Sequence, residues 1–393
     1  MAYVENIFWI SFILLFYCYI GYGFLLAVMN RLQSIFKRPV IVQSPRPGEI
    51  TMIVAAYNES AILEKKIKNC LDLNYPAGKL KFIFITDGST DDTPQIVAKY
   101  PGIQLLHNFE RKGKLAAIKR AMQIIDTPLV VFSDANSMLN KDAILKITLH
   151  YNNPSIGGVA GEKRILPQPG SGVSQAEGLY WQYESFLKKQ DSGFYTVVGA
   201  AGELFSIRTS LFKNPDDSII LDDFLISMQV CLQHHKIAYE PGAYAIEAAS
   251  SSLAEEEKRK VRISAGAYQS VGYLTECLNI FSYPLLAVQY FSRRLLRWII
   301  CPVLLPILFF ANFYIVNATQ SHAVYNWLFN FQMAFYLLAM AGWALIKSGK
   351  KAGILSVPFY FVFMNYCLVK GFYRFLRGKQ SVLWEKSLRG AVN

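Results

Sequence analysis

Apolar residues gather at the two ends of the chain, and the segment between them alternates short apolar and polar runs. No charged residue interrupts residues 7–29, and none occurs over 298–346. About 20 successive apolar residues are enough to cross the hydrocarbon core of a bilayer. The pattern therefore predicts one membrane span at 7–29, two within 298–346, and a weaker third candidate at 352–369 that polar residues dilute.

The middle segment shows strand-like apolar runs that alternate with helical patterns. Such alternation is typical of α/β domains, in which crossover helices join parallel strands. The expected strands are 50–56, 81–86, 103–106 and 129–133. Beyond residue 134 an α+β region is expected, with helices at 143–151 and 222–232, strands near 158–165 and up to 207, and a mobile loop at 167–172.

These patterns divide the chain into five parts. Residues 274–297 are apolar but contain Pro284, which indicates an amphipathic segment lying at the membrane interface. The predicted parts are an N-terminal anchor (1–36), a globular domain (37–273), the interfacial segment (274–297), two or three transmembrane helices (298–372) and a basic tail (373–393).

The formal net charge of +12 belongs mainly to the membrane part. From residue 274 to the end, 12 Lys or Arg residues stand against two Glu residues. Basic and aromatic residues beside spans anchor them at the lipid headgroups, which argues against a nucleic-acid partner. We interpret Arg293, Arg294 and Arg297 as such anchors and place Trp298 in the aromatic belt.

The charges around the first span predict its orientation. Glu5 precedes the span, whereas Arg31, Lys37 and Arg38 follow it, so the positive-inside tendency places the globular domain in the cytoplasm. Residues 7–29 lack a basic n-region and a small-residue cleavage site, which indicates an anchor rather than a signal peptide. The sequence thus predicts a multi-pass protein of the cytoplasmic (inner) membrane.

A carboxylate and an amide follow the last buried strand, as Asp134-Ala135-Asn136. Ligands of α/β sheets collect beyond the carboxyl ends of the strands, and hard cations accept both carboxylate and amide oxygens. This motif is a candidate site for a divalent cation held against a diphosphate. The competing interpretation is an Asp that caps the next turn.

Polar residues also follow the first two strands. Ala56-Tyr57-Asn58-Glu59 ends the first strand and Asp87-Gly88 ends the second, so both should reach one crevice, where Asp87 could accept hydrogen bonds from a base or ribose. Lys112 and Lys114 follow and could neutralise a phosphate. Each feature has an ordinary alternative, because Asp-Gly is a common turn and paired lysines often line a solvated helix face.

Two charged groups occur later in the domain. Asp222-Asp223 opens a helix, where acidic residues are also favourable with the helix dipole. Arg259, Lys260 and Arg262 follow three glutamates, and the alternative for them is a solvated helix face with i,i+4 pairing.

The order of these motifs resembles the family 2 glycosyltransferases, which include cellulose, chitin and hyaluronan synthases and bacterial exopolysaccharide enzymes. The resemblance covers most of the chain. It implies a GT-A fold, a Rossmann-like nucleotide-sugar domain, here inserted between transmembrane helices. The segments that carry it are 54–59, 86–93, 112–114, 133–136, 221–223 and 259–262.

The resemblance also implies roles for individual residues. The nucleotide sugar would be held by Ala56, Tyr57, Glu59, Asp87, Gly88, Lys114 and Asp134. Mg²⁺ or Mn²⁺ would be bound by Asp134 and Asn136, and the amide of Asn136, in place of the family's second Asp, should loosen the metal site.

For the chemical step, the resemblance implies that Asp223 is the general base and Asp222 its partner. Arg259, Arg262 and Gly202 would contact the diphosphate or the acceptor. The family's Gln-x-x-Arg-Trp motif is altered, because Arg259 replaces its Gln and Ile263 its Trp. The aromatic platform for an acceptor sugar is therefore expected to be missing, which argues against processive polymerisation.

The expected function is an inverting transfer of a sugar from a nucleotide donor, most simply a UDP-sugar, to a lipid-linked or glycan acceptor at the membrane. A processive synthase that extrudes its polymer is the alternative within the enzyme class. A catalytically inactive scaffold or channel subunit is the alternative outside it. Membrane lipids are expected partners, and a polysaccharide-export protein or a homo-oligomer is a candidate partner.

Overall fold

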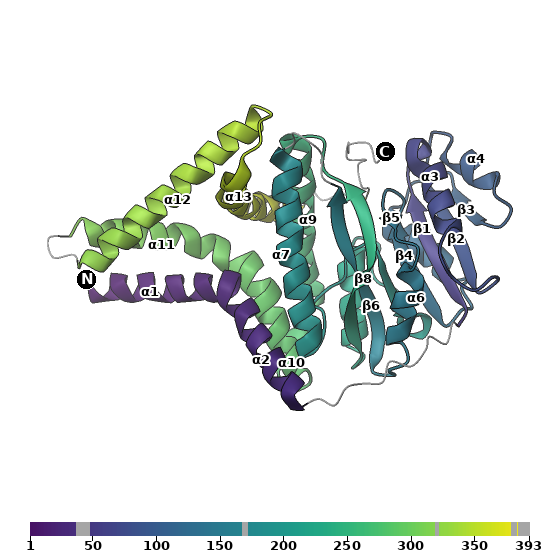
Figure 1. The fold of residues 1–393 in the computed structure, drawn as a ribbon, viewed down its shortest axis with the longest axis horizontal. Coiled ribbons are helices and arrows are strands. Elements are labelled where there is room, and N and C mark those ends of the chain that lie inside the picture. The colour runs from purple at the N-terminus through teal and green to yellow at the C-terminus, as the bar shows by residue number, and fades with distance from the viewer. Residues whose placement is uncertain (37–47, 167–171, 319–321, 379–382, 384–393) are drawn as a thin grey trace.

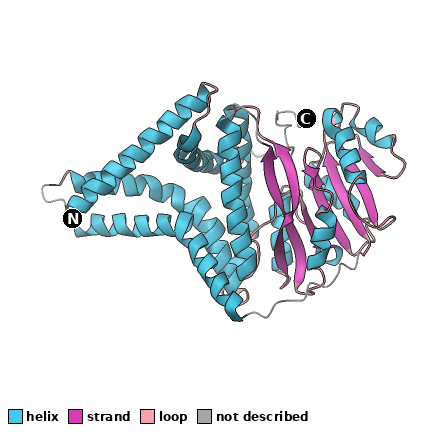
Figure 2. Cartoon of the chain, viewed as in Figure 1, coloured by secondary structure: helices cyan, strands magenta, loops and turns pink. Residues whose placement is uncertain are grey.

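The computed structural model describes residues 1–36, 48–166, 172–318, 322–378 and 383. Residues 167–171 of the predicted loop at 167–172 and most of the predicted tail lie outside these residues, as do Lys37 and Arg38, and Gly172 belongs to a helix. Within them, the strands occupy one half of the molecule and the other half is helical (Figure 2). Helix α7 (Gly172–Phe194) stands between the two halves (Figure 1).

Eight strands form one mixed sheet in the order β3-β2-β1-β4-β7-β6-β8-β5. Strands β3, β2, β1 and β4 are parallel to one another, as predicted. The strands are β1 Ile50–Ala56, β2 Leu80–Asp87, β3 Gln104–Asn108, β4 Leu129–Asp134, β5 Met138–Leu139, β6 Ile156–Leu166, β7 Phe205–Arg208 and β8 Lys236–Ala248. The four strands predicted for the parallel half are confirmed to within two residues at each end.

The core lies on both faces of this sheet. Along β1, Ile53 packs into the cluster on one face, whereas Met52 and Val54 belong to the cluster on the other. Both faces are covered by helices, and every residue of β1 is buried. A continuous apolar run is the sequence pattern of such a strand.

The remaining helices of the sheet half lie on the two faces of the sheet or connect the sheet to the helical half. They are α3 Ser60–Leu71, α4 Thr93–Ala98, α5 Lys114–Met122, α6 Ala143–His150, α8 Asp222–Cys231 and α9 Leu253–Tyr273. The expected helices at 143–151 and 222–232 are confirmed to within a residue at each boundary.

The pattern did not reveal β8, which is the longest strand of the sheet among the described residues. It contains Pro241 and Gly242, which are typical of a turn. In the structure β6 pairs with β8 up to Glu240 and resumes at Tyr244, so the two turn-like residues lie in an irregularity between them. A bulge lets one strand carry residues that a regular ladder would reject.

The helical half contains four helices long and apolar enough to cross a membrane within the described residues: Ala2–Ile35, Pro284–Val316, Ala323–Lys347 and Gly353–Leu376. The first comprises α1 (Ala2–Phe16), a π-helical turn (Tyr17–Gly21) and α2 (Tyr22–Phe36). The second comprises α10 (Pro284–Tyr290), a π-helix (Phe291–Ile300) and α11 (Cys301–Val316), and the others contain α12 (Ala323–Lys347) and α13 (Ser356–Leu376). Helices α1 and α11 lie side by side and share an apolar cluster (Figure 1).

The boundary expected at residue 297 differs from the structure. A helical run continues from Pro284 to Val316, so only 274–283 precede it as a separate segment. Pro284 does not break a helix, because it occupies the first turn of α10. Proline is favoured there, because the first turn needs no internal N–H bond.

The interpretation of Arg293 and Arg297 as lipid anchors is wrong. Arg293 is 2% exposed and pairs with Glu184 and Asp191 of α7, at 2.7 and 3.2 Å. Arg297 pairs with the other oxygen of Glu184 at 2.6 Å. Charged groups on α7 therefore draw these side chains into the protein, between the two halves of the molecule.

Candidate active site

A cavity of about 1110 Å³ connects the two halves of the molecule. At the sheet end it is lined by residues after β1 and β4 and at the start of α8, among them Tyr57, Asp134 and Asp223. At the other end its walls are apolar side chains of α1, α11 and α12, such as Phe12 and Leu308. The cavity thus combines a polar pocket at the strand ends with an apolar extension among the membrane helices.

The loops after β1 and β2 are tied to each other. The side chain of Asn58 accepts a hydrogen bond from the Thr90 amide at 2.8 Å, and the Asn58 amide donates to Ser89 at 3.2 Å. Asp91 accepts from the amide of Ser60 at 3.1 Å, at the start of α3. Parallel pairing of β1 with β2 brings these two motifs together, as the sequence predicted.

Asp87 does not face the cavity. Its side chain is 1% exposed, and its Oδ2 accepts from the amides of Lys112 and Gly113 at 3.0 and 2.7 Å. Gly88 has a φ of 66°, and a Cβ there would lie 2.6 Å from that of Arg111. In this structure the Asp87-Gly88 pair shapes the loop that leads to Lys114, and its contact with a base or ribose stays a prediction. Ala56 is likewise buried within the strand.

Lys114 lies at the centre of the polar end. Its Nζ donates to Asp134 Oδ1 at 2.7 Å and lies 3.6 Å from Asp222 Oδ2. Burial works against its charge, but the carboxylates of Asp134, Asp222 and Asp223 outweigh it and raise the pKa of Lys114. The residue is therefore a fixed cation among acidic groups.

Gly202 keeps this centre open. A Cβ at Gly202 would lie 3.0 Å from Lys114 Nζ, 3.3 Å from Asp223 Oδ2 and 3.5 Å from Asp134 Oδ2. The glycine therefore stands where the side chains of three motifs converge. Any side chain here would fill space that a bound sugar or phosphate could occupy.

Asp223 lies beside Asp222 at the N-terminal end of α8. Burial, and then the carboxylate of Asp222, raise the pKa of Asp223 to about 7, while Lys114 acts in the opposite direction. One oxygen accepts the Phe224 amide at 2.8 Å, and the other points toward Gly202 and the cavity. A half-buried carboxylate with a pKa near neutrality can accept a proton from a hydroxyl group.

A buried lysine stabilises the end of β4 through hydrogen bonds. Lys66 is fully buried on α3, and its Nζ donates to Ser133 Oγ at 2.8 Å and to the Ser137 carbonyl at 2.5 Å. Ser137 Oγ in turn donates to the Asp134 carbonyl at 2.9 Å. These bonds set the turn that presents Asp134 and Asn136 to the cavity.

Asp134 and Asn136 have the features of a cation site that a ligand completes. Asn136 Oδ1 is buried and has no hydrogen-bond partner within the described chain. No group of three His, Cys, Asp or Glu side chains there is arranged to hold a metal without help. Mg²⁺ is often bound by one or two carboxylates together with substrate phosphates, so these residues fit an ion that arrives with a diphosphate.

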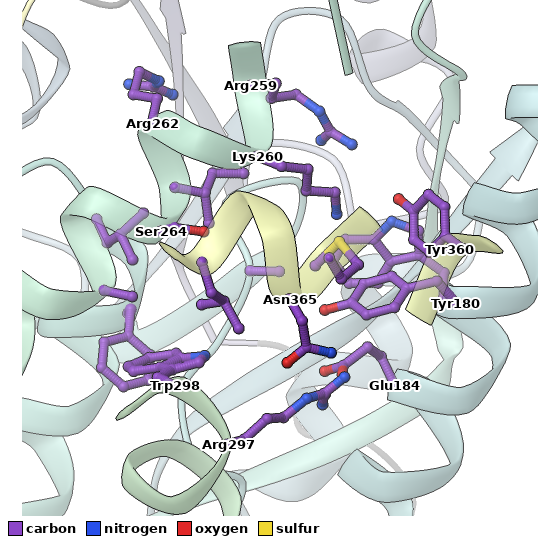
Figure 3. A pocket seen from close by; sticks show the side chains of 18 of the residues that line it. Tyr180, Glu184, Arg259, Lys260, Arg262, Ser264, Arg297, Trp298, Tyr360 and Asn365 are labelled. Carbon is purple, nitrogen blue, oxygen red and sulfur yellow. The ribbon is translucent and has the colours of Figure 1, made fainter. Parts of the chain in front are cut away.

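Arg259 and Arg262 extend in different directions from α9 (Figure 3). Arg259 is bound by Glu177 and Glu256, and Glu256 also accepts from Tyr360 of α13 at 2.7 Å. Two carboxylates therefore already hold Arg259 in this structure, and its contact with a diphosphate stays a prediction. Of the alternative interpretation, the pairing within the helix is present, since Lys260 lies 3.6 Å from Glu256 four residues earlier, but the face is not solvated at Arg259, whose side chain is 9% exposed.

The sequence reasoning missed Trp298 as a cavity residue. Its ring packs edge-on against Phe224, with the centroids 5.3 Å apart, and it lines the cavity rather than an outer belt (Figure 3). Arg294 lies over both rings and donates to the Val198 carbonyl at 2.9 Å. Phe224 directly follows Asp223, so the indole stands near the candidate base. The Arg297-Trp298 dipeptide was the available signal in the sequence. It lies far from Asp223 along the chain, so the pattern did not indicate that Trp298 reaches the cavity.

Comparison with known proteins gives consistent results. Residues 51–214 match the family described as Glycosyl transferase family 2. The poly-beta-1,6-N-acetyl-D-glucosamine synthases of Staphylococcus aureus (strain COL) and Staphylococcus epidermidis (strain RP62A) are 27% and 24% identical over 252 and 247 residues. These alignments cover 60% of this chain, and the chain spans 58% of the length of those relatives.

Among solved structures, the fold is similar to that of the mannosyltransferase PcManGT from Pyrobaculum calidifontis, determined in complex with GDP-Man and Mn²⁺. The TM-score is 0.66 at 19% identity, and the alignment covers 96% of this chain and all of that one. At this identity the likeness shows the fold, including the helical half, and confirms the expected GT-A architecture.

Proposed function

Because residues 51–214 form a family 2 glycosyltransferase domain, we propose that the chain is an inverting glycosyltransferase that moves a sugar from a nucleotide donor to a membrane-associated acceptor. The observation that carries the proposal is the cavity itself. It places Asp223, Lys114 and Asp134 together at one end and continues between membrane helices at the other. A UDP-sugar is the proposed donor.

In the proposed step, Asp223 takes the proton from the acceptor hydroxyl as its oxygen forms a bond to the anomeric carbon. The bond from that carbon to the diphosphate breaks, and the diphosphate leaves with the electron pair. Lys114 and Arg262 lie on the cavity wall, where they can stabilise the negative charge that develops on the leaving group. Burial, and then the carboxylate of Asp222, keep the pKa of Asp223 high, so that the base is matched to neutral pH.

Asp134 and Asn136 are the proposed ligands of Mg²⁺ or Mn²⁺. Such an ion, when bound, supplies positive charge to the diphosphate as it leaves. The amide of Asn136 gives the ion one neutral ligand, where a second carboxylate would bind it more tightly.

Replacing Asn136 with Asp should therefore tighten Mn²⁺ binding. We expect the Kd of the ion, measured by calorimetry in the presence of UDP, to fall by about tenfold, because one charge-assisted contact replaces a neutral one. The half-saturating Mn²⁺ concentration for transfer should fall in parallel. Asn153, an exposed Asn away from the cavity, is the control for an Asn-to-Asp change. An unchanged Kd would mean that Asn136 is not a ligand.

The acceptor is proposed to enter from the membrane end. Phe12, Leu308 and Phe331 give that part of the cavity an apolar wall, which suits the hydrocarbon chain of a lipid-linked acceptor. Trp298 offers a flat ring near Asp223 for the sugar or headgroup that accepts the transfer. This ring takes the place of the aromatic residue that the altered motif lacks.

We also propose that α13 lies along the membrane surface and does not cross it. Tyr360 and Lys370 of α13 both contact the start of α9, at Glu256 and Glu257, and Phe375 packs on Tyr268 near its other end. The first part of α9 carries seven charged residues between 255 and 262, which cannot lie in hydrocarbon. Because α13 packs along α9, it should lie on the same side of the membrane as the sheet domain.

A reporter fused after residue 393 should therefore face the same compartment as the sheet domain. The same reporter placed before residue 1 should face the other side, because α1 starts at the end of the helical half that lies far from the sheet (Figure 1). Protease protection in sealed membrane vesicles measures both. A C-terminal reporter on the side of the N terminus would show that α13 crosses.

The relatives favour a second candidate, a processive synthase, because those proteins are named as synthases of a polysaccharide. The two candidates differ in their products. We propose a single transfer, and a ladder of long chains formed from the donor alone would contradict it. An inactive scaffold, the alternative outside the enzyme class, would not require Lys114, Asp134 and Asp223 to meet in one cavity.

Thermal shift of the detergent-solubilised chain against UDP-, GDP- and dTDP-sugars with Mn²⁺ tests the donor, and radiolabelled transfer to membrane lipid extract tests the reaction. We expect a UDP-sugar to stabilise the protein and to label a lipid-extractable product. No stabilisation and no transfer with any of these donors would overturn the proposed function.

A further inference from the structure

Helix α13 makes a close crossing with α9. A Cβ on Gly371 would lie 2.4 Å from Ser264 Cβ and 2.9 Å from the backbone nitrogen of Ala265. One turn further along α9, Tyr268 packs against Phe372 and Phe375 of α13. The absence of a side chain at Gly371 lets the two helices touch at this point, three residues before Arg374.

Arg374 of α13 and Arg262 of α9 line the same cavity as Asp222 and Asp223, and the charges of these three neighbours all act on Arg262. Both are half-buried. Among the described residues neither guanidinium has an ion pair or a hydrogen bond within the protein. Their neighbours differ in this respect, since Arg259 is held by two glutamates and Lys370 by Glu257.

Two guanidinium groups that line one cavity and make no ion pair among the described residues can hold an anion between them. Burial is the main cause that lowers the pKa of Arg262; Asp222 and Asp223 oppose it, whereas the charges of Arg259 and Arg374 add to it, so an anion bound here would relieve the repulsion between Arg262 and Arg374. Arginine presents a planar fork that matches phosphate oxygens, so a phosphoester is the anion that this pair suits best.

We propose that Arg374 and Arg262 form a phosphate-binding pair, in which the C-terminal membrane-side helix supplies half of the site. The proposal rests on the proposed function, because the phosphate would belong either to the donor's diphosphate or to a phosphorylated lipid acceptor. It assigns to Arg374 the contact with a phosphate that the resemblance implied for Arg259. It also makes the docking of α13 on α9 a condition for substrate binding.

The first test uses equilibrium binding to the full chain in nanodiscs, with inorganic pyrophosphate, UDP and decyl phosphate as probes. Arg374→Ala should weaken one class of probe by about ten- to 100-fold, since a hydrogen-bonded ion pair to a charged group is lost. Arg374→Lys should retain part of the affinity, because the charge remains without the fork. Arg377→Ala is the control, as Arg377 is exposed one turn later and does not line the cavity.

The probes separate the two sources of phosphate. Weaker binding of pyrophosphate and UDP in Arg374→Ala assigns the pair to the donor, and weaker binding of decyl phosphate alone assigns it to the acceptor. Affinities for all three probes within twofold of wild type would overturn the proposal. Probe binding is measured without sugar transfer. A protein that transfers no sugar would therefore contradict the proposed function, and the effect of Arg374→Ala on probe affinity could still be measured.

A second variant tests the crossing without touching the arginine. Gly371→Val should push α13 from α9 and weaken the same probes as Arg374→Ala. Gly272→Ala is the matched control, since a Cβ at this position of α9 has no atom within 4 Å. Wild-type affinity in a folded Gly371→Val protein would contradict the proposed coupling of α13 to the site.

Discussion

Asp223→Asn should lower kcat for sugar transfer by about 10²–10⁴ and leave the Kd of the donor within about twofold. The amide cannot take the proton of the acceptor hydroxyl, but it has the size of the carboxylate. It also removes the repulsion from Asp222 and retains an oxygen that can accept the Phe224 amide. Folding should thus be preserved, and single-turnover transfer with saturating donor measures the loss.

The pH profile gives an independent check of this role. Since the pKa of Asp223 is raised to about 7, the base is protonated and inactive at lower pH. The wild-type kcat should therefore rise about tenfold per pH unit below 7 and level off above it. Asp72→Asn, an exposed change away from the cavity, should keep both the rate and the profile. A residual Asp223→Asn rate within tenfold of wild type would remove Asp223 from the mechanism.

The parallel half of the fold could be predicted from the sequence because its physical causes are local. A strand buried on both faces, such as β1, must be apolar throughout, and its end is marked by polar residues. The antiparallel half is different. Strand β8 contains Pro241 and Gly242, and only its pairing with β6 shows that these residues sit in an irregularity.

The site shows the same division between local and long-range causes. The motifs at the strand ends share one sheet edge, so Tyr57 and Asp134 could be expected to meet. Whether a charged side chain is available to a ligand depends on its partners from other elements. Glu177 of α7 holds Arg259, and backbone amides hold Asp87, and no pattern within α9 or β2 indicates either contact. Trp298 packs at the cavity against Phe224 of α8, a contact between residues far apart in the sequence.

The membrane helices show what hydropathy alone cannot resolve. By length and composition α13 resembles a span, yet its contacts run along a charged helix of the sheet domain. Arg293 and Arg297, beside an apolar stretch, resemble lipid anchors, yet they pair with Glu184. A partner from a distant part of the chain decides where the two arginines lie, and contacts of the same kind are the basis for proposing that α13 does not cross the membrane.

The buried group around Arg293 leads to the largest expected effect on stability. Arg293→Met should destabilise the protein by about 3–5 kcal/mol, because it leaves Asp191 and one oxygen of Glu184 buried without their cation. Tyr22 and Gln289 would still donate to Asp191, at 2.6 and 3.5 Å, but neither is charged. We expect a melting temperature lower by several degrees or more in detergent, together with faster thermal inactivation.

Two comparisons separate this effect from a general loss of charge. Lys68→Met breaks an exposed pair with Glu64, and should change stability by less than about 1 kcal/mol. Adding Asp191→Asn to Arg293→Met should restore part of the lost stability, because the uncompensated carboxylate is then neutral. If Arg293→Met melted with the wild type, the two carboxylates would not depend on Arg293. The junction between the sheet and the membrane helices would then be held by apolar packing alone.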